Sequence, residues 1–339
     1  MDDTSKKINR MPAEWETHSA VWLAWPYDQI TFGSLNQKDE KLNVERLGKV
    51  EQTFTKIIEA LEGSEQVKII YRDKSFSKDN TQIFQADYAD VWTRDYMPSF
   101  VKDADDKLKA VKWIYNAYGE KFSDLLKDND VWTEINKDLN VETINTSLIM
   151  ESGAIDVNGT GVLLTTEQCL LKRNPNLSKA EIEKVFAENL GINKVIWLKA
   201  GLVNDHTDGH IDEIARFVAP SKIVCAYEEN VNEENFKILD DNYQLLKNFT
   251  DVNGKNFEVI KLPMPHMVYD NGVKAPASYA NFYIGNKIIL ASIFNDPNDD
   301  KALEIIQSCF PERKVVGIDC SEIIYGGGAI HCITQQEPI

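Results

Sequence analysis

A pattern of apolar strand, polar loop, amphipathic helix and second apolar strand recurs along this chain, and it limits the fold more than any other feature. The first unit has a helix near 42–61, where apolar residues recur with the spacing of one helix face: Phe54, Ile57, Ile58 and Leu61. Further units start near residues 161, 221 and 287, and a weaker one lies between 100 and 144. In the second unit, Ser178 with Glu181 three residues later predicts the start of a helix.

About five such modules, without sequence identity between them, indicate a ring or an array of repeated units. The length of 339 residues exceeds the usual limit for one hydrophobic core, so two domains or one modular ring are expected. A doubly wound open sheet is the alternative, because repeated strand–helix–strand units do not decide whether a sheet closes. No glycine-rich dinucleotide or phosphate loop follows any of these strands.

The charge of the chain restricts its partners. With 37 Lys and Arg against 54 Asp and Glu, the formal charge is −17, which disfavours nucleic acid and is compatible with a cationic substrate. No stretch reaches the apolar length of a membrane span. The segment Met1–Lys7 is polar and lacks the apolar run of a signal peptide, so we expect a cytoplasmic protein without a membrane partner.

The cysteines point to one candidate nucleophile. There are five, an odd number, without a CxxC pair, so neither a disulfide framework nor a structural zinc site is expected. Cys332 lies just beyond three consecutive glycines, which allow the backbone to turn tightly and approach a ligand. It is a candidate exposed nucleophile. The alternative is a glycine-rich hairpin before a buried strand with an inert thiol; the other four cysteines are interpreted as small buried hydrophobes.

Two histidines lie within the polar stretch 204–213. His206 and His210 are four residues apart, a spacing that holds zinc on a helix, but Gly209 between them and the flanking pattern predict loop and strand instead. Acid–base use of His210, with Asp212 on the same strand face, is the more attractive interpretation. A solvated polar turn stays open. His331 is a poor candidate for the base that serves Cys332, because neighbours on an extended strand point to opposite faces.

Two carboxylates are further candidates for ligand binding. Asp95 follows Arg94 between aromatic residues, so it either forms a structural ion pair or presents its carboxylate to a ligand. Glu151 stands at the edge of an apolar run, as a buried carboxylate or as a solvated strand end.

One thiol, one imidazole and several acids suit a particular chemistry. Nearby carboxylates raise the pKa of a thiol and weaken it as a nucleophile, a cost that makes sense if the substrate is a cation. A planar guanidinium pairs bidentately with carboxylates, and its charge then favours the thiolate. The residues therefore fit attack by Cys332 on a guanidinium carbon better than peptide hydrolysis.

At these residues the chain resembles the agmatine deiminase branch of the peptidyl-arginine deiminase superfamily, also called the guanidino-group-modifying or pentein superfamily. The resemblance covers nearly the whole chain. It rests on the order of seven segments: Met11–Glu16, Trp92–Asp95, Glu151–Gly153, Leu164–Glu167, Gly209–Glu213, Ser278–Phe282 and Gly326–Gln336.

The resemblance implies one catalytic α/β domain over residues 1–339: a five-bladed α/β propeller in which pseudo-fivefold ββαβ units surround a central channel. It implies Cys332 as nucleophile, His210 as general acid and base, and Asp95 and Asp212 as the groups that grip the guanidinium. Glu151 would belong to the same acidic shell. The remaining substrate-binding residues that it implies are Trp92, His206, Asn281 and Gly327.

The implied reaction converts agmatine and water to N-carbamoylputrescine and ammonia, without a metal or an organic cofactor. The stretch Trp113–Gly119 has no Arg, unlike peptidyl-arginine enzymes of the family, and resembles the agmatine type. Ser152 and His206 depart from that branch, which usually has Gly and an acid there. Another guanidine substrate, such as peptidyl-arginine, therefore stays open.

Two further hypotheses come from different classes of protein. A metal-dependent amidohydrolase would use His206, His210 and Asp212, and a non-catalytic protein would bind polyamine-like cations. The sequence leaves homodimerisation open.

Overall fold

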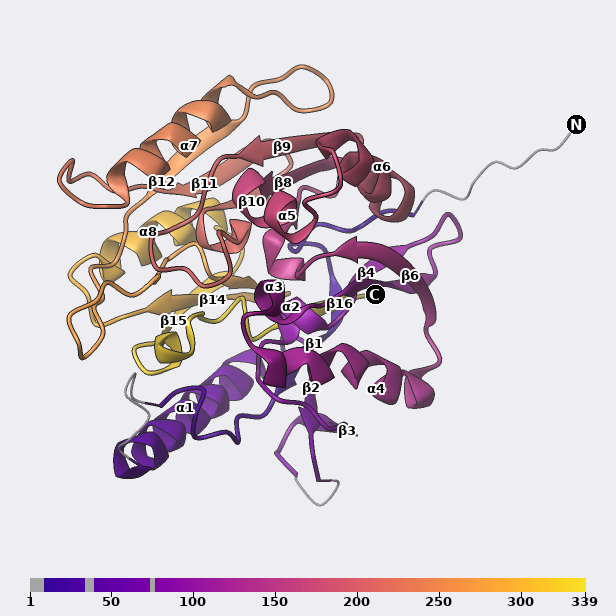
Figure 1. Cartoon of the computed structure of the whole chain (residues 1–339), viewed down its shortest axis with the longest axis vertical. Helices are drawn as coiled ribbons and strands as arrows, with labels where there is room; N and C mark the ends of the chain where they lie inside the picture. The colour runs from indigo at the N-terminus through magenta and orange to yellow at the C-terminus, as the bar shows by residue number, and fades with distance from the viewer. Residues whose placement is uncertain (1–8, 34–39, 74–76) are drawn as a thin grey trace, which may run out of the picture.

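The computed structural model describes residues 9–33, 40–73 and 77–339, so the polar segment Met1–Lys7 lies outside the described residues. Their strands form five separate sheets. The modules expected from the sequence pattern are confirmed. Helices α1, α4, α6 and α7 lie toward the periphery of the molecule, whereas α2 and α3 lie near its middle (Figure 1).

Four of the sheets repeat one plan. The first strand is antiparallel to the second, and the second is parallel to the third after a helical crossover. These ββαβ units comprise β4 (Ser99–Lys102), β5 (Leu108–Ile114), α4 (Val131–Leu139) and β6 (Glu142–Ile149); β7 (Asp156–Val157), β8 (Val162–Thr166), α5 (Glu167–Arg173), α6 (Lys179–Leu190) and β9 (Lys194–Leu198); β10 (Ala215–Ala219), β11 (Lys222–Ala226), α7 (Phe236–Asn248) and β12 (Glu258–Leu262); and β13 (Tyr283–Ile284), β14 (Ile288–Ile293), α8 (Asp299–Cys309) and β15 (Lys314–Asp319).

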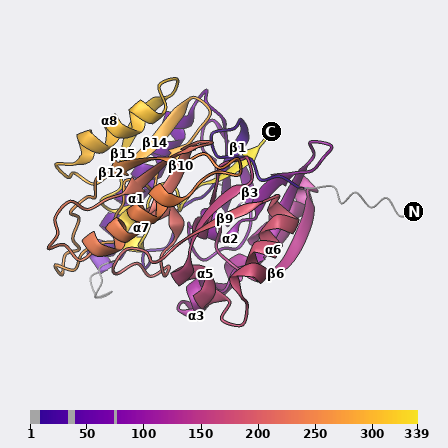
Figure 2. The same ribbon diagram turned by 90° about the horizontal axis from the view of Figure 1, so that it is seen from above.

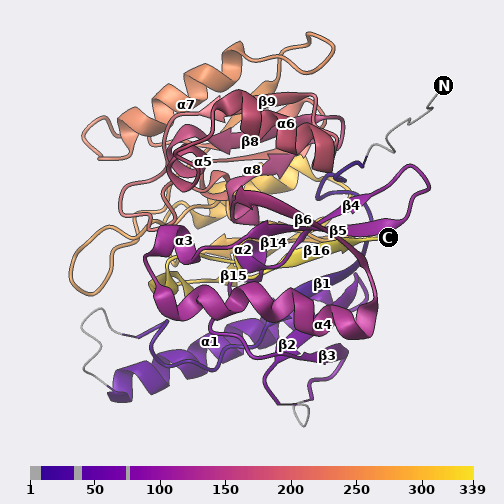
Figure 3. The same ribbon diagram turned by 45° about the vertical axis from the view of Figure 1, so that its right-hand side comes forward.

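The fifth sheet joins the two ends of the described chain. Its elements are β16 (Gln335–Pro338), β1 (His18–Ala24), α1 (Glu40–Leu61), β2 (Gln66–Tyr71) and an additional strand, β3 (Thr81–Gln85). β16 is antiparallel to β1, and β1 is parallel to β2, so the C-terminal strand completes the N-terminal unit. The C-terminus accordingly lies near β1 in two views (Figures 2 and 3).

Local sequence signals explain several boundaries. Ser178 and Glu181 form the expected capping box at the start of α6, and Gly191 ends that helix with a φ of 72°. The expected inward face of α1 is buried, including Phe54, Ile57 and Leu61. Among the described residues, no helix is both long and apolar enough to cross a membrane.

The connections between units contain buried turns, and these turns position the site. The connections contain α2 (Thr93–Tyr96) and three 3-10 turns: η2 (Ser152–Ala154), η3 (Ile211–Glu213) and η4 (Ile323–Gly326). The turns α3 (Ala117–Glu120) and η1 (Ser123–Asp130) precede α4. Glu151, His210, Asp212 and Asn281 are fully buried in these connections.

Candidate active site

Each of the five connections between units contributes at least one of the polar groups predicted from the sequence. Asp95 comes from the connection β3–β4, Glu151 from β6–β7, and His210 with Asp212 from β9–β10. The last two connections supply the others, Asn281 from β12–β13 and Cys332 from β15–β16. Repetition of one architectural unit therefore gathers side chains that are far apart in sequence.

The thiol of Cys332 lies within a group of polar side chains. Its Sγ is 3.1 Å from Asn281 Nδ2, 3.6 Å from Asp212 Oδ2 and 3.7 Å from Glu213 Oε1. Burial, together with the charges of Asp212, Glu213 and Asp95, raises the pKa of the Cys332 thiol well above its ordinary value. The thiol is therefore protonated until a cation compensates these charges.

A turn, rather than the strand expected from the sequence, presents Cys332. Residues 330–333 form this turn, and the backbone N–H of His331 donates to Asn281 Oδ1 at 2.8 Å. The backbone N–H of Arg94 donates to the carbonyl of Cys332. The prediction of an extended strand was wrong here, because β16 begins only at Gln335, beyond the thiol.

The imidazole of His210 lies in a second polar group. Its Nε2 is 3.4 Å from Glu151 Oε2, and its Nδ1 is 3.7 Å from Asp95 Oδ1. Burial alone would lower the pKa of His210, but Asp95, Cys169 and Glu151 outweigh it and raise that pKa well above its usual value. Residues 211–213 form a 3-10 turn, so the predicted strand-face relation between His210 and Asp212 was also wrong.

Glu151 is the buried carboxylate that one of the two interpretations predicted. It accepts from Arg173 Nε at 2.9 Å, and the Cys169 sulfur is 4.0 Å from its Oε2. Burial opposes ionisation, but bonds from His210 and Arg173 lower the pKa of Glu151 below its ordinary value. Cys169 is thus a buried core residue as predicted, and its sulfur also contacts the site through Glu151.

Gly153 marks the space between the two groups. A Cβ added there would lie 2.7 Å from Asp95 Oδ1, 2.7 Å from His210 Nδ1 and 3.2 Å from Asp212 Oδ2. Within these two groups, three buried polar atoms lack a hydrogen-bond partner in the described structure: His210 Nδ1, Asp212 Oδ1 and Glu213 Oε2. Buried polar atoms are normally paired, so these atoms are available to a polar ligand.

A chain of ion pairs supports Asp212 from behind. His331 Nδ1 is 2.7 Å from Asp212 Oδ2, and its Nε2 is 2.8 Å from Glu14 Oε2. Arg216 donates to the same Glu14 oxygen at 2.8 Å. Burial would raise the pKa of Asp212, but the bond and charge of His331 lower it. Asp212 is therefore held as a carboxylate.

Trp92 and the glycine loop lie on another side of the thiol. A Cβ added to Gly328 would lie 2.9 Å from Trp92 Cζ3 and 3.1 Å from Cys332 Sγ. Gly327, with a φ of 92°, lies directly against the His206 ring, which is edge-on to Tyr118 at 5.3 Å. The predicted substrate-binding residues Trp92, Gly327 and His206 therefore border the space around the thiol and its neighbours.

Potential metal ligands occur in two groups among the described residues: Glu151, Cys169 and His210, and Asp212, Glu213 and Cys332. His206 belongs to neither, so the three ligands required by the amidohydrolase hypothesis do not form one such group. Arg94 does not pair with Asp95 as one interpretation expected; it is 3.6 Å from Glu14 and donates to Gln336.

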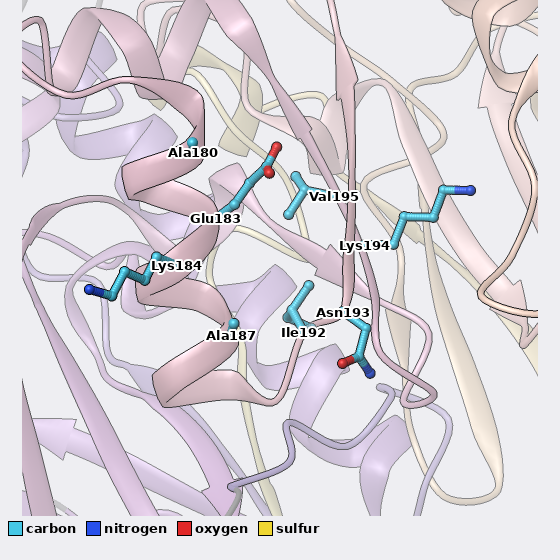
Figure 4. Close-up of a pocket in the computed structure, with 8 residues that line it drawn as sticks. All are labelled: Ala180, Glu183, Lys184, Ala187, Ile192, Asn193, Lys194 and Val195. Atoms are coloured by element: carbon cyan, nitrogen blue, oxygen red, sulfur yellow. The ribbon is translucent and has the colours of Figure 1, made fainter.

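Several groups in the site were not assigned a role from sequence. Glu213 stands in the quoted segment Gly209–Glu213, so its signal was present. Glu14 and Tyr118 also stand in segments compared with the family, Met11–Glu16 and Trp113–Gly119, whereas Cys169 and Arg173 carried no signal that separates them from ordinary core residues. A surface pocket between α6 and β9, lined by residues such as Glu183 and Lys184, contains none of the predicted site residues (Figure 4).

A cysteine, a histidine and carboxylates gathered by five ββαβ units define the pentein class of guanidino-group-modifying proteins. The protein DDAH from Pseudomonas aeruginosa shares the fold, with a TM-score of 0.54 at 14% identity. Residues 10–338 match the sequence model of the Porphyromonas-type peptidyl-arginine deiminases, and the chain belongs to that family.

Closer relatives cover the chain almost completely. A curated relative from Legionella pneumophila (strain Paris) is 35% identical over 331 residues, which cover 97% of this chain and 95% of the relative. The agmatine deiminase of Enterococcus faecalis matches with a TM-score of 0.87 at 32% identity, over 97% of this chain and 96% of that chain. A substrate-bound agmatine deiminase of C. jejuni, with Ser in place of one Cys, matches with a TM-score of 0.88 at 27% identity, over 99% and 98%.

Proposed function

We propose that this chain is an agmatine deiminase, a hydrolase that converts agmatine and water to N-carbamoylputrescine and ammonia. The observation that carries the proposal is the convergence of Asp95, His210 and Asp212 on the space beside Gly153, with Cys332 Sγ 3.6 Å from Asp212. The similarity to the agmatine deiminases of E. faecalis and C. jejuni supports agmatine as the substrate. We further propose that the chain acts as one catalytic unit.

Substrate binding comes first in the proposed mechanism. Asp95 and Asp212 accept hydrogen bonds from the guanidinium nitrogens and hold its carbon near the sulfur. The substrate's positive charge offsets the carboxylates that raise the pKa of Cys332. Binding therefore favours loss of the thiol proton to solvent, and the free enzyme needs no preformed thiolate.

Two displacements at the guanidinium carbon follow. The Cys332 thiolate attacks the carbon, and His210, whose raised pKa favours the imidazolium, donates a proton to the departing ammonia. The resulting amidino group is bonded to sulfur. His210 then removes a proton from water, the water oxygen attacks the same carbon, and the thiolate leaves N-carbamoylputrescine behind.

The decisive experiment is ammonia release from a panel of agmatine, arginine, peptidyl-arginine and guanidinobutyrate. We expect turnover of agmatine by the wild-type chain and none by Cys332→Ala, with the melting temperature of the variant preserved. Cys225→Ala is the matched control, since that thiol is buried in β11 away from the site. Turnover of peptidyl-arginine in preference to agmatine would overturn the substrate assignment, and agmatine binding without turnover would overturn the enzymatic one.

A further inference from the structure

The turn Ala117–Glu120 has an unusual backbone. Its four residues have φ values of 54°, 59°, 80° and 64°, so the turn is left-handed although only Gly119 lacks a Cβ. Left-handed conformations cost free energy in residues with a Cβ, and consecutive ones are rare. Such backbone strain persists only where the surrounding structure imposes it, and it concentrates at functional sites.

Specific bonds hold this turn in place. Asn116 Oδ1 accepts from the backbone N–H of Gly119 at 2.8 Å, and Glu120 N donates to the Asn116 carbonyl at 2.7 Å. Lys121, directly after the turn, pairs with Asp208 at 2.7 Å. The turn is thus fastened both to its own start and to the connection that carries His210.

The result of this conformation is the position of Tyr118. Its ring is buried and lies 6.1 Å from the His210 ring, and its hydroxyl donates to Asp95 Oδ2 at 2.8 Å. The other Asp95 oxygen, Oδ1, accepts from the backbone N–H of Gly153 at 3.2 Å. One donor on each oxygen fixes the rotation of the carboxylate plane.

We infer that Tyr118 is a positioning residue for Asp95. The left-handed turn places Tyr118 so that its hydroxyl orients the Asp95 carboxylate and favours the ionised form of that carboxylate for guanidinium binding. This inference rests on the proposed function, because it assigns to Asp95 the binding of a guanidinium. Burial and the neighbouring Asp95 raise the pKa of Tyr118 well above its ordinary value, so the hydroxyl keeps its proton and remains a donor.

The ionisation of Asp95 responds to several groups. Burial raises its pKa to about 7; His210 opposes this with its positive charge, Asp212 and Glu151 add to it with negative charges, and the Tyr118 bond lowers it. The Cys332 thiol and the Tyr115 hydroxyl also lie within the influence of the Asp95 charge. Since the pKa lies near neutrality, loss of one donor to the ionised form changes the fraction of competent enzyme at neutral pH.

The test is Tyr118→Phe, which removes only the hydroxyl. We expect the acid limb of the kcat/KM profile for agmatine to move to higher pH by about one unit, with about a tenfold loss at pH 6.5 and recovery toward wild type at pH 8.5. Agmatine affinity in a Cys332→Ala background should weaken in the same pH-dependent way. Tyr115→Phe is the matched control, because it also removes one buried hydroxyl, on a ring whose centroid lies 5.5 Å from that of Tyr118, but this hydroxyl makes no hydrogen bond to Asp95 in the described structure.

The outcomes separate this inference from the proposed function. A wild-type chain that releases no ammonia from agmatine removes the proposed function. An active wild type whose Tyr118→Phe profile is unshifted, or shifted equally by Tyr115→Phe, overturns the role of Tyr118 alone. If Tyr118→Phe does not fold, Gly119→Ala replaces it: the added Cβ at a φ of 80° would lie 3.1 Å from Arg173 Nη1 and displace the turn with the hydroxyl intact. The same acid-limb shift is then expected, and an unchanged profile overturns the inference.

Discussion

Two buried histidines, His210 and His331, occupy equivalent places in the fold but differ in how their ring nitrogens are hydrogen-bonded. Each lies in a connection between units, and both are almost completely buried. His331 has a carboxylate oxygen within 2.8 Å of each ring nitrogen, whereas His210 Nδ1 has no hydrogen-bond partner in the described structure. His210 therefore keeps one ring nitrogen available to a substrate, whereas both ring nitrogens of His331 are occupied.

Closeness in sequence to the nucleophile does not identify the residue that carries its protons. His331 is the direct neighbour of Cys332, yet its nitrogens are directed to Asp212 and Glu14. His210 comes from a different unit and faces the space beside Gly153. We therefore assign proton transfer to His210 and support of Asp212 to His331.

The largest effect should separate these two roles. His210→Gln is expected to lower kcat for agmatine by about 10³-fold, because general acid–base catalysis contributes about 10² to 10⁴-fold. Steady-state ammonia release measures it, and His266→Gln, at a partly exposed surface position, is the control. If His331→Gln lowers kcat more than His210→Gln does, the two assignments are reversed.

The role of the space beside Gly153 can be tested without substituting either histidine. Gly153→Ala should lower kcat/KM by about 100-fold, because its Cβ would enter the space beside Asp95 and His210, and small displacements at a reacting centre have effects of that size. The φ of Gly153 is not positive, so its backbone accepts alanine, and the clash falls on the Asp95 and His210 side chains, which the Cβ would displace. Gly48→Ala, in α1 with no neighbour within 4 Å of its added Cβ, should retain full activity. Unimpaired turnover by Gly153→Ala would show that substrate binds elsewhere.

Much of the fold was predictable because it is encoded locally. The periodicity of α1 and the capping box at Ser178 each lie within a few residues of the boundary they predict. The first strand of three units was not singled out, since β7 and β13 have only two residues each and β4 only four. Their assignment depends on pairing with β8, β14 and β5, which short apolar runs do not specify.

The site residues were likewise predictable in their identity but not in their geometry. Cys332, His210 and Asp95 stand in distinctive segments, so their residue types and the resemblance marked them. Their geometry followed from tertiary structure, because the turns at 211–213 and 330–333 replaced the expected strands. Tyr118 was not predictable: its importance depends on a left-handed turn of mostly non-glycine residues, which no local rule favours.

His331→Gln should affect stability and pH dependence more than the chemical step. Removing the ring leaves the Asp212 and Glu14 carboxylates buried without their shared partner, and breaking such pairs costs about 3–5 kcal/mol in the free energy of unfolding. Because His331 lowers the pKa of Asp212, its stabilisation is present above the unfolded-state pKa of an aspartate and is lost as pH falls through the folded-state pKa.

Urea unfolding of wild type and His331→Gln at pH 7 and at pH 3.5 measures that loss. The difference in unfolding free energy should be larger at pH 7 than at pH 3.5. A difference that is independent of pH would indicate a packing role for the ring instead of a charge role.

The smallest expected effect concerns which carboxylate, Asp212 or Asp95, contributes more to the raised pKa of the Cys332 thiol. Asp212, the partner of His331, raises the pKa of Cys332 more than Asp95, the neighbour of His210, does. Asp212→Asn should therefore speed iodoacetamide alkylation of Cys332 at pH 8 by about tenfold, and Asp95→Asn by less, since one pKa unit changes the thiolate fraction about tenfold. Alkylation of the half-buried Cys309 is subtracted with Cys332→Ala.

Both aspartate variants should lose turnover of agmatine. Faster alkylation of Cys332 together with slower turnover would show that the carboxylates serve substrate binding at the expense of thiol reactivity. If the two variants accelerate alkylation equally, the thiol responds to the total negative charge around it. The aspartate beside His331 would then affect the thiol no more than the aspartate beside His210.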